Sequence, residues 1–206
     1  RTVGGPLTDN AFRLFPVFFR ANGLDPSTVK FNNMDLRLRE AVFMRKEVDA
    51  ITGFDSTVWL NLRGLGVKFE DISIMLYSQH GLDLYSNTVI VSRKFLKENE
   101  AAIPGFLRAC AKGWRDAAAD PVAVTESLFK VDALVNKEIE RDRLKWVLDH
   151  QVKGTETDRL GLGQIEMPRL VKSIELLARG LELPATVAPE KIWTDKYLPA
   201  ADLRRI

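Results

Sequence analysis

The chain has 206 residues, of which 46% are hydrophobic and 28% charged, a balance typical of a folded protein rather than a disordered one. Thirty Lys and Arg against 28 Asp and Glu leave a net charge of +2, so the composition does not indicate a nucleic-acid-binding protein. Every apolar stretch is broken by charge well short of the ~20 apolar residues of a membrane span, which excludes a transmembrane protein.

The spacing of apolar residues over roughly the first ninety residues predicts strands that alternate with helices, the pattern of an α/β protein. A strand at 1–6 leads into a helix that begins at the capping residue types Thr8, Asp9 and Asn10 and stops at Asn22-Gly23. The same patterns predict strands at 29–32, 48–54, 72–77 and 88–91, with helices at 36–46 and 56–62.

From Arg93 onward the pattern is helical nearly to the end of the chain. Apolar residues keep a helical period over 101–119, and Pro121 is placed to open another helix at its first turn. Two further helices are predicted around 139–148 and at 170–180, the second ending at a glycine. The expectation is an α/β part followed by a helical C-terminal part.

Residues that carry catalysis or bind metals are scarce. The chain has only two histidines, His80 and His150, far apart in the sequence and without cysteine neighbours, so the ligand cluster of a zinc site is missing. The single cysteine, Cys110, lies on the apolar stripe of its helix and is expected to be a buried packing residue rather than a nucleophile. We therefore expect no catalytic residue, no metal and no cofactor.

The turn between the first strand and the first helix is the first candidate ligand site. Glycine lets the backbone approach a ligand, and a helix start offers unpaired N–H groups with a partial positive charge, which suits a polar or anionic group. The alternative is that these residues only cap the helix. The candidate contacts are Gly5, Pro6, Leu7, Thr8, Asp9 and Asn10.

A second candidate site follows the strand at 48–54, because open α/β sheets bind ligands at the carboxyl ends of their strands. Phe54 and Asp55 lie there, and the Asp55 carboxylate can accept hydrogen bonds from a ligand amino group or, alternatively, cap the next helix. Tyr85 and Asn87, just before the strand predicted at 88–91, can add an aromatic ring and an amide, although such aromatics usually belong to a core.

The order of these motifs resembles a known family. Beside the Gly-rich turn at 4–10 stand Gly-Leu-Asp-Pro at 23–26, Val-Asp-Ala at 48–50, and Ser-Asn-Thr-Val-Ile-Val-Ser-Arg-Lys-Phe-Leu at 86–96. Together they resemble the solute-binding proteins of ABC importers for nitrate, sulfonates, taurine and pyrimidine precursors of thiamine. That family also includes the pyrimidine-precursor synthases of thiamine biosynthesis.

The resemblance implies a two-lobed fold of the type II periplasmic-binding-protein class, truncated at the N-terminus. Residues 1–80 would form the second lobe, and 81–206 the remainder of the first lobe with its strand and helices. The first half of the first lobe, with the export signal, would precede Arg1. Apolar surface left exposed by that truncation would be covered by a missing N-terminal segment or by a second copy of the chain.

The resemblance also implies a function. Such proteins hold a small-molecule solute between their lobes, in the periplasm or another extracytoplasmic space, and deliver it to the permease of an ABC transporter. An acidic Asp55 would repel nitrate or a sulfonate and favours an amino-pyrimidine-like or other nitrogen-bearing solute.

Two other hypotheses come from different classes of protein. A pyrimidine-synthase-like enzyme would need a histidine donor and a cysteine-rich iron-binding motif, and the chain has one cysteine. A ligand-sensing domain of a transcription regulator shares the two-lobed fold, and a native N-terminus with a helix-turn-helix rather than an export signal would identify it.

Overall fold

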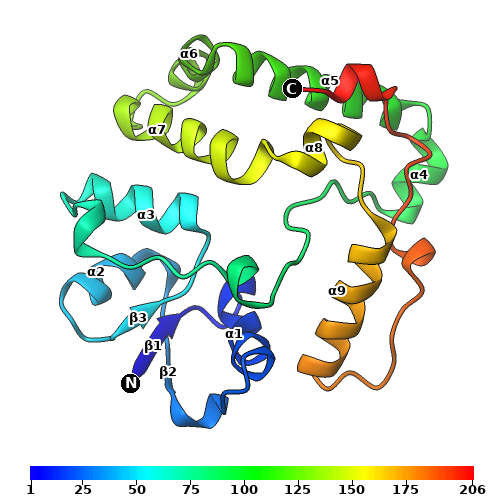
Figure 1. Ribbon diagram of the computed structural model, residues 1–206. Helices are drawn as coiled ribbons and strands as arrows, with labels where there is room; N and C mark the ends of the chain where they lie inside the picture. The colour runs from blue at the N-terminus through cyan, green and yellow to red at the C-terminus, as the bar shows by residue number, and fades with distance from the viewer. The chain divides into compact units, whose positions relative to one another are not determined.

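The computed structural model describes residues 1–206, which divide into two compact units (Figure 1). Unit 1 consists of Arg1–Leu84 and Leu170–Val187, and unit 2 of Tyr85–Arg169 and Ala188–Ile206. Unit 1 combines a parallel sheet with helices and unit 2 is helical, so the chain as a whole agrees with the predicted α/β fold class. The two-lobed type II fold and the lobe boundary at residue 80 stay predictions.

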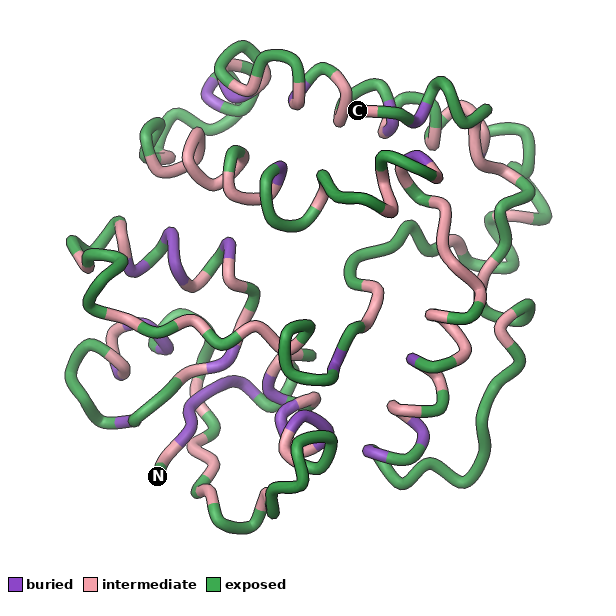
Figure 2. Tube along the Cα trace, in the orientation of Figure 1, coloured by how far each residue is buried: buried purple, intermediate pink, exposed green.

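Unit 1 is built on a small parallel sheet of strand order β2-β1-β3. The strands are β1 (Thr2–Gly5), β2 (Lys30–Asn33) and β3 (Ala50–Ile51), with Val3 of β1 opposite Phe31 on one side and Ala50 on the other. Because β1 pairs on both edges, its backbone is enclosed, and Figure 2 shows it as one of the buried stretches of the unit. Parallel pairing requires crossover connections, and helices α1 and α2 lie in those between β1 and β2 and between β2 and β3; α3 follows the last strand.

Helix α1 (Asn10–Ala21) covers the sheet with an aromatic face. Its buried side chains include Phe12 and Phe15, whose rings each meet the Phe31 ring of β2 edge to face at 5.2 Å between centroids. The helix continues through Pro16 and ends at Ala21 with Asn22 as its C-cap, and Gly23 takes the positive φ that such an ending favours. The predicted start and stop of this helix are both confirmed.

The remaining helices of unit 1 are α2 (Arg39–Met44), α3 (Asp55–Gly64) and most of α9 (Met167–Gly180). Helix α9 joins α1 through a small core of Val17, Phe18 and Leu82, against which Leu176 packs. The Arg20 guanidinium also donates a hydrogen bond of 2.5 Å from Nη1 to the Gly180 carbonyl. Contacts between residues far apart in the sequence therefore hold the segment after residue 170 to the sheet of unit 1.

Unit 2 is helical, as the sequence predicts for the C-terminal part. It contains α4 (Arg93–Asn99), α5 (Ala102–Ala119), α6 (Pro121–Val131), α7 (Lys137–Val147) and α8 (Thr155–Leu160). The buried Arg204 guanidinium donates to the carbonyls of Leu160 (3.1 Å) and Leu162 (2.8 Å), which ties the C-terminal residues to the end of α8. Cys110 in α5 is half-buried rather than fully buried.

The predicted strands at 72–77 and 88–91 are wrong. Residues Tyr77–His80 form a 3-10 turn, and the Tyr77 ring stacks on Phe18 of α1 at 4.7 Å instead of joining the sheet. Residues 88–91 form no strand and do not join the sheet, and Ile90 is 89% exposed. The strand at 48–54 shrinks to Ala50–Ile51, and the helix at 36–46 divides into a 3-10 turn, Leu36–Leu38, and α2.

No helix in the structure is both long enough and apolar enough to span a membrane.

The contact between α9 and α1 generates the first prediction. A Cβ on Gly180 would lie 2.5 Å from Cγ1 of Val17, a β-branched side chain that cannot turn aside within its helix. We expect Gly180→Ala to lower the free energy of unfolding by about 1–3 kcal/mol in urea denaturation. Gly113→Ala, within α5 and with open space around it, is the matched control and should raise stability by up to about 1 kcal/mol. Equal stability of the two variants would contradict the close approach of α9 to α1.

Candidate functional site

The carboxyl ends of β1 and β3 form the candidate site. From β1 the chain first forms β2 on one side of β1 and then forms β3 on its other side. The connections that follow β1 and β3 therefore lead away from each other, and a switch point lies between these two strands. Open α/β sheets bind ligands at such a switch point. The two segments that leave the sheet there are the turn Pro6–Asp9, which enters α1, and the turn Thr52–Phe54, which enters α3. We call them the α1 turn and the α3 turn.

The α1 turn is held in place by side-chain to backbone hydrogen bonds. Asn33, at the end of β2, accepts from the Leu7 N–H through Oδ1 at 3.1 Å. Asp9 accepts from the Ala11 N–H through Oδ1 at 2.8 Å and is the N-cap of α1, so the predicted capping role is present. Pro6 is buried, whereas Leu7, Thr8 and Asn10 are exposed.

The α3 turn lies directly beside the end of β1. The Thr52 N–H donates to the Gly4 carbonyl at 3.1 Å, and a Cβ on Gly5 would stand 2.5 Å from Thr52 Oγ1. Gly5 is therefore a position at which a side chain would push the two strand ends apart. The Thr52 hydroxyl is buried and has no hydrogen-bond partner, an unusual state for a buried polar group.

Asp55 and Phe54 occupy the start of α3. Asp55 is the first residue of the helix and half-buried, and the residue in the N-cap position is Phe54, so Asp55 does not provide the capping predicted as its alternative role. A carboxylate in the first turn still interacts favourably with the helix dipole. The Phe54 side chain is 41% exposed.

A buried arginine joins the two turns. The Arg39 side chain, 2% exposed at the start of α2, donates from Nη1 to the Thr52 carbonyl at 3.1 Å and lies 3.4 Å from Oδ2 of Asp9. Its Nη2 pairs with the Glu40 carboxylate at 2.7 Å, and the Asn61 amide donates to the same Glu40 oxygen at 3.2 Å. Two carboxylates and a carbonyl thus compensate for the burial of one guanidinium.

Tyr85 belongs to a separate network in unit 2. Its hydroxyl donates to the Glu156 carboxylate and accepts from the Glu166 N–H at 2.8 Å. Arg169 lies over the ring at 4.2 Å and also binds Glu156 through Nη1 at 2.8 Å. Partial burial and the adjacent Glu156 charge raise the pKa of Tyr85 to about 12. Tyr85 therefore serves a local hydrogen-bond network of unit 2.

The structure brings most of the predicted site residues together in unit 1, and two lie elsewhere. Tyr85 and the exposed Asn87 are in unit 2. Sequence reasoning missed Arg39 and Thr52. The only signal for Arg39 was its place in an Arg-Glu pair directly before the apolar run at 41–43. Thr52 carried no signal beyond its place at a strand end. The members brought together are Gly5, Pro6, Leu7, Thr8, Asp9, Asn10, Phe54 and Asp55.

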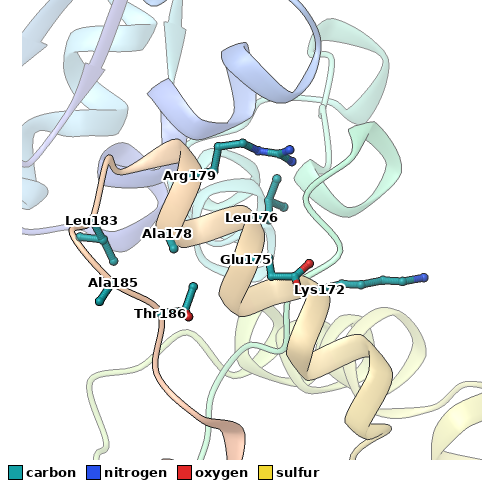
Figure 3. A pocket seen from close by; sticks show the side chains of 8 residues that line it. All are labelled: Lys172, Glu175, Leu176, Ala178, Arg179, Leu183, Ala185 and Thr186. Carbon is teal, nitrogen blue, oxygen red and sulfur yellow. The ribbon is translucent and has the colours of Figure 1, made fainter.

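A hollow in unit 1 lies beside α9 and does not include the candidate site (Figure 3). It has a volume of about 600 Å³ and is lined by the last turns of α9 and the segment that follows, including Lys172, Glu175 and Arg179. No group of three or more His, Cys, Asp or Glu side chains is placed to hold a metal ion.

One family model matches the chain. It is described as NMT1/THI5 like and covers residues 1–124, which include the whole α/β part with the α1 turn and the α3 turn. No curated protein matches the chain.

The Tyr85 network predicts a pH-dependent contribution to stability. At about pH 8 we expect Tyr85→Phe to lower the free energy of unfolding by about 1–2 kcal/mol, because the Glu156 carboxylate and the Glu166 N–H lose their shared partner. The pKa of Tyr85 is higher in the folded chain, about 12, than the ~10 of an unfolded tyrosine. The contribution is therefore fully present below about pH 10 and is lost as the pH rises toward 12.

Urea denaturation of both proteins at about pH 8 and about pH 11 measures this effect, and the difference between them should shrink at the higher pH. Tyr197→Phe is the control, since its hydroxyl contacts the exposed Glu100 at 2.8 Å and its loss should cost less at pH 8. A constant difference at both pH values would show that the Tyr85 hydroxyl is not held in its neutral form by folding.

The Thr52 hydroxyl generates a second stability prediction. Because this buried group has no partner, replacing it with a methyl in Thr52→Val should leave stability unchanged or raise it by up to about 1 kcal/mol in urea denaturation. Thr125→Val is the matched control: Thr125 is equally buried but donates to the Val122 carbonyl at 2.9 Å, so it should lose about 1 kcal/mol. A clear loss on Thr52→Val would mean that its hydroxyl has a partner in solution.

Proposed function

The chain belongs to the NMT1/THI5-like family, and from this membership we propose that it binds a small organic solute at the ends of β1 and β3 and performs no chemistry on it. The family supports small-molecule binding in general terms, including a relation to thiamine precursors. The proposal places that binding at the α1 turn and the α3 turn.

One observation carries the proposal: two turns rich in polar groups converge at the switch point of a parallel sheet. Thr8 and Asn10 are exposed at the start of α1, where the first N–H groups of the helix lack intrahelical partners. Asp55 opens α3 a short distance from β3. A small solute placed there meets hydroxyl, amide and carboxylate groups in addition to the N–H groups of α1.

The solute that fits this set best carries basic or amino nitrogen. The Asp55 carboxylate accepts hydrogen bonds from an amino group and attracts a cation, whereas it repels nitrate or a sulfonate. The two carboxylates beside Arg39 add a second negative charge that one guanidinium does not balance. We therefore favour an amino-pyrimidine-like or other nitrogen-bearing solute over the anionic alternatives.

The proposal extends to delivery of the solute. In this view the chain acts outside the cytoplasm and passes the solute to the permease of an ABC importer. The resemblance to importer solute-binding proteins supports this step.

The test is a binding comparison between the wild-type chain and Asp55→Asn. Isothermal titration with an aminopyrimidine, taurine and nitrate should give measurable binding of the aminopyrimidine by the wild type. Asp55→Asn keeps the size of the side chain and removes its charge, so we expect about a tenfold or larger loss of affinity for the aminopyrimidine, because a charged hydrogen bond is lost.

Asp71→Asn is the matched control, since Asp71 is an exposed carboxylate elsewhere in the same unit and its loss should leave affinity unchanged. Affinity for the aminopyrimidine that Asp55→Asn leaves intact would contradict the assigned contact. Preference of the wild type for taurine or nitrate would contradict the proposed solute class, and failure to bind any of the three would contradict binding of these solutes altogether.

A further inference from the structure

A single buried guanidinium connects the α1 turn with the α3 turn. The Arg39 side chain reaches Asp9 of the first turn and the Thr52 carbonyl of the second, at 3.4 Å and 3.1 Å from the same Nη1 atom. Any change in the position of Nη1 therefore acts on both of them.

The backbone of the α3 turn is shaped around this side chain. A Cβ on Gly53 would lie 2.5 Å from Arg39 Nη1 and 3.0 Å from its Cζ, so the guanidinium occupies the space in which a side chain at position 53 would stand. A side chain at position 53 would therefore displace the guanidinium of Arg39. The guanidinium itself is held from behind by the Glu40 carboxylate, with contacts of 2.7 Å to Nη2 and 3.3 Å to Nε.

Burying a charge in this way does little for stability, because the loss of hydration cancels much of the attraction between the ions. An apolar side chain of similar volume would pack at the same place without that loss. An apolar side chain forms no directional hydrogen bonds. A planar guanidinium that donates hydrogen bonds from several edges holds its partners in one geometry.

We propose that Arg39 is a positioning residue for solute binding, which fixes the α1 turn against the α3 turn through Asp9 and the Thr52 carbonyl. The inference rests on the proposed function in that these turns contact the solute. Arg39 touches no solute itself. Its effect is that the two turns are already arranged before the solute arrives, so binding does not have to order them.

The first measurement requires no ligand. Amide hydrogen exchange, followed by NMR on the folded chain, reports on Ala11, whose N–H is bound by Asp9, and on Thr52, whose N–H is bound by the Gly4 carbonyl. In Arg39→Met we expect both amides to exchange about tenfold faster or more, while the amide of Phe18 in the middle of α1 keeps its rate. Unchanged exchange at Ala11 or Thr52 overturns the proposal, and so does an equal increase at Phe18, which would mean general destabilisation.

The second measurement is affinity for the aminopyrimidine, at temperatures where each variant is fully folded. We expect Arg39→Met to bind about tenfold more weakly or worse. Arg39→Lys keeps the charge with a single donor group and should recover part of the affinity without reaching the wild type. Arg37→Met, which removes an exposed arginine just before α2, should change neither exchange nor affinity.

The outcomes separate the two proposals. If the wild type binds and Arg39→Met binds equally well, the positioning role is overturned while the proposed function stands. If the wild type binds no solute, the proposed function fails, and the exchange rates of Ala11 and Thr52 still decide whether Arg39 holds the turns. Should Arg39→Met not fold, Arg39→Lys carries the same comparison of Ala11 and Thr52 with Phe18.

Discussion

The pairing of β1 on both edges is the constraint on which unit 1 depends. A strand with neighbours on each side has no free edge, so its backbone groups are paired within the sheet. Its last three residues, Val3, Gly4 and Gly5, are also buried on the faces of the sheet, where small or apolar residues fit. The glycines also allow Val48 and Thr52, on either side of β3, and Phe12 of α1 to approach closely. Each of β2 and β3 pairs only with β1, and Phe31 of β2 also packs on the aromatic face of α1, so β1 and α1 largely set their positions. The ends of all three strands are thereby brought to one edge of the sheet.

Charge burial at this edge follows from the parallel arrangement. Three strands that end together leave backbone carbonyls and helix starts in a small space, and these polar groups need partners. Asn33, Asp9 and Arg39 satisfy several of them from different segments of the chain. The network therefore has two effects at once: it satisfies buried polar groups, and it joins turns that the sheet alone would leave independent.

The sequence predicted local features well and pairing poorly. The first helix was foreseen at both ends because capping residues, aromatic spacing and Asn-Gly are all local signals. The strands at 72–77 and 88–91 failed because apolar residues in an extended segment also pack on helices, as Tyr77 does on Phe18, and strand formation depends on a neighbour that local sequence does not reveal. For the site, the two turns could be predicted from glycine and strand-end position. Arg39 could not, because its partners lie 30 residues before it and 13 residues after it.

The predicted ligand residues divide into two groups once their contacts are known. Gly5 and Pro6 are buried, and Asp9 is engaged by Ala11 and Arg39, so these three build the turn. Thr8 and Asn10 are exposed beside them and have side chains that can reach a solute. The short stretch 5–10 contains both the residues that build the turn and those that can reach a solute, and the sequence alone does not show which residue has which role. The separation matters for mechanism, because a change at Asp9 alters the shape of the site, whereas a change at Thr8 or Asn10 alters only what the site can hold.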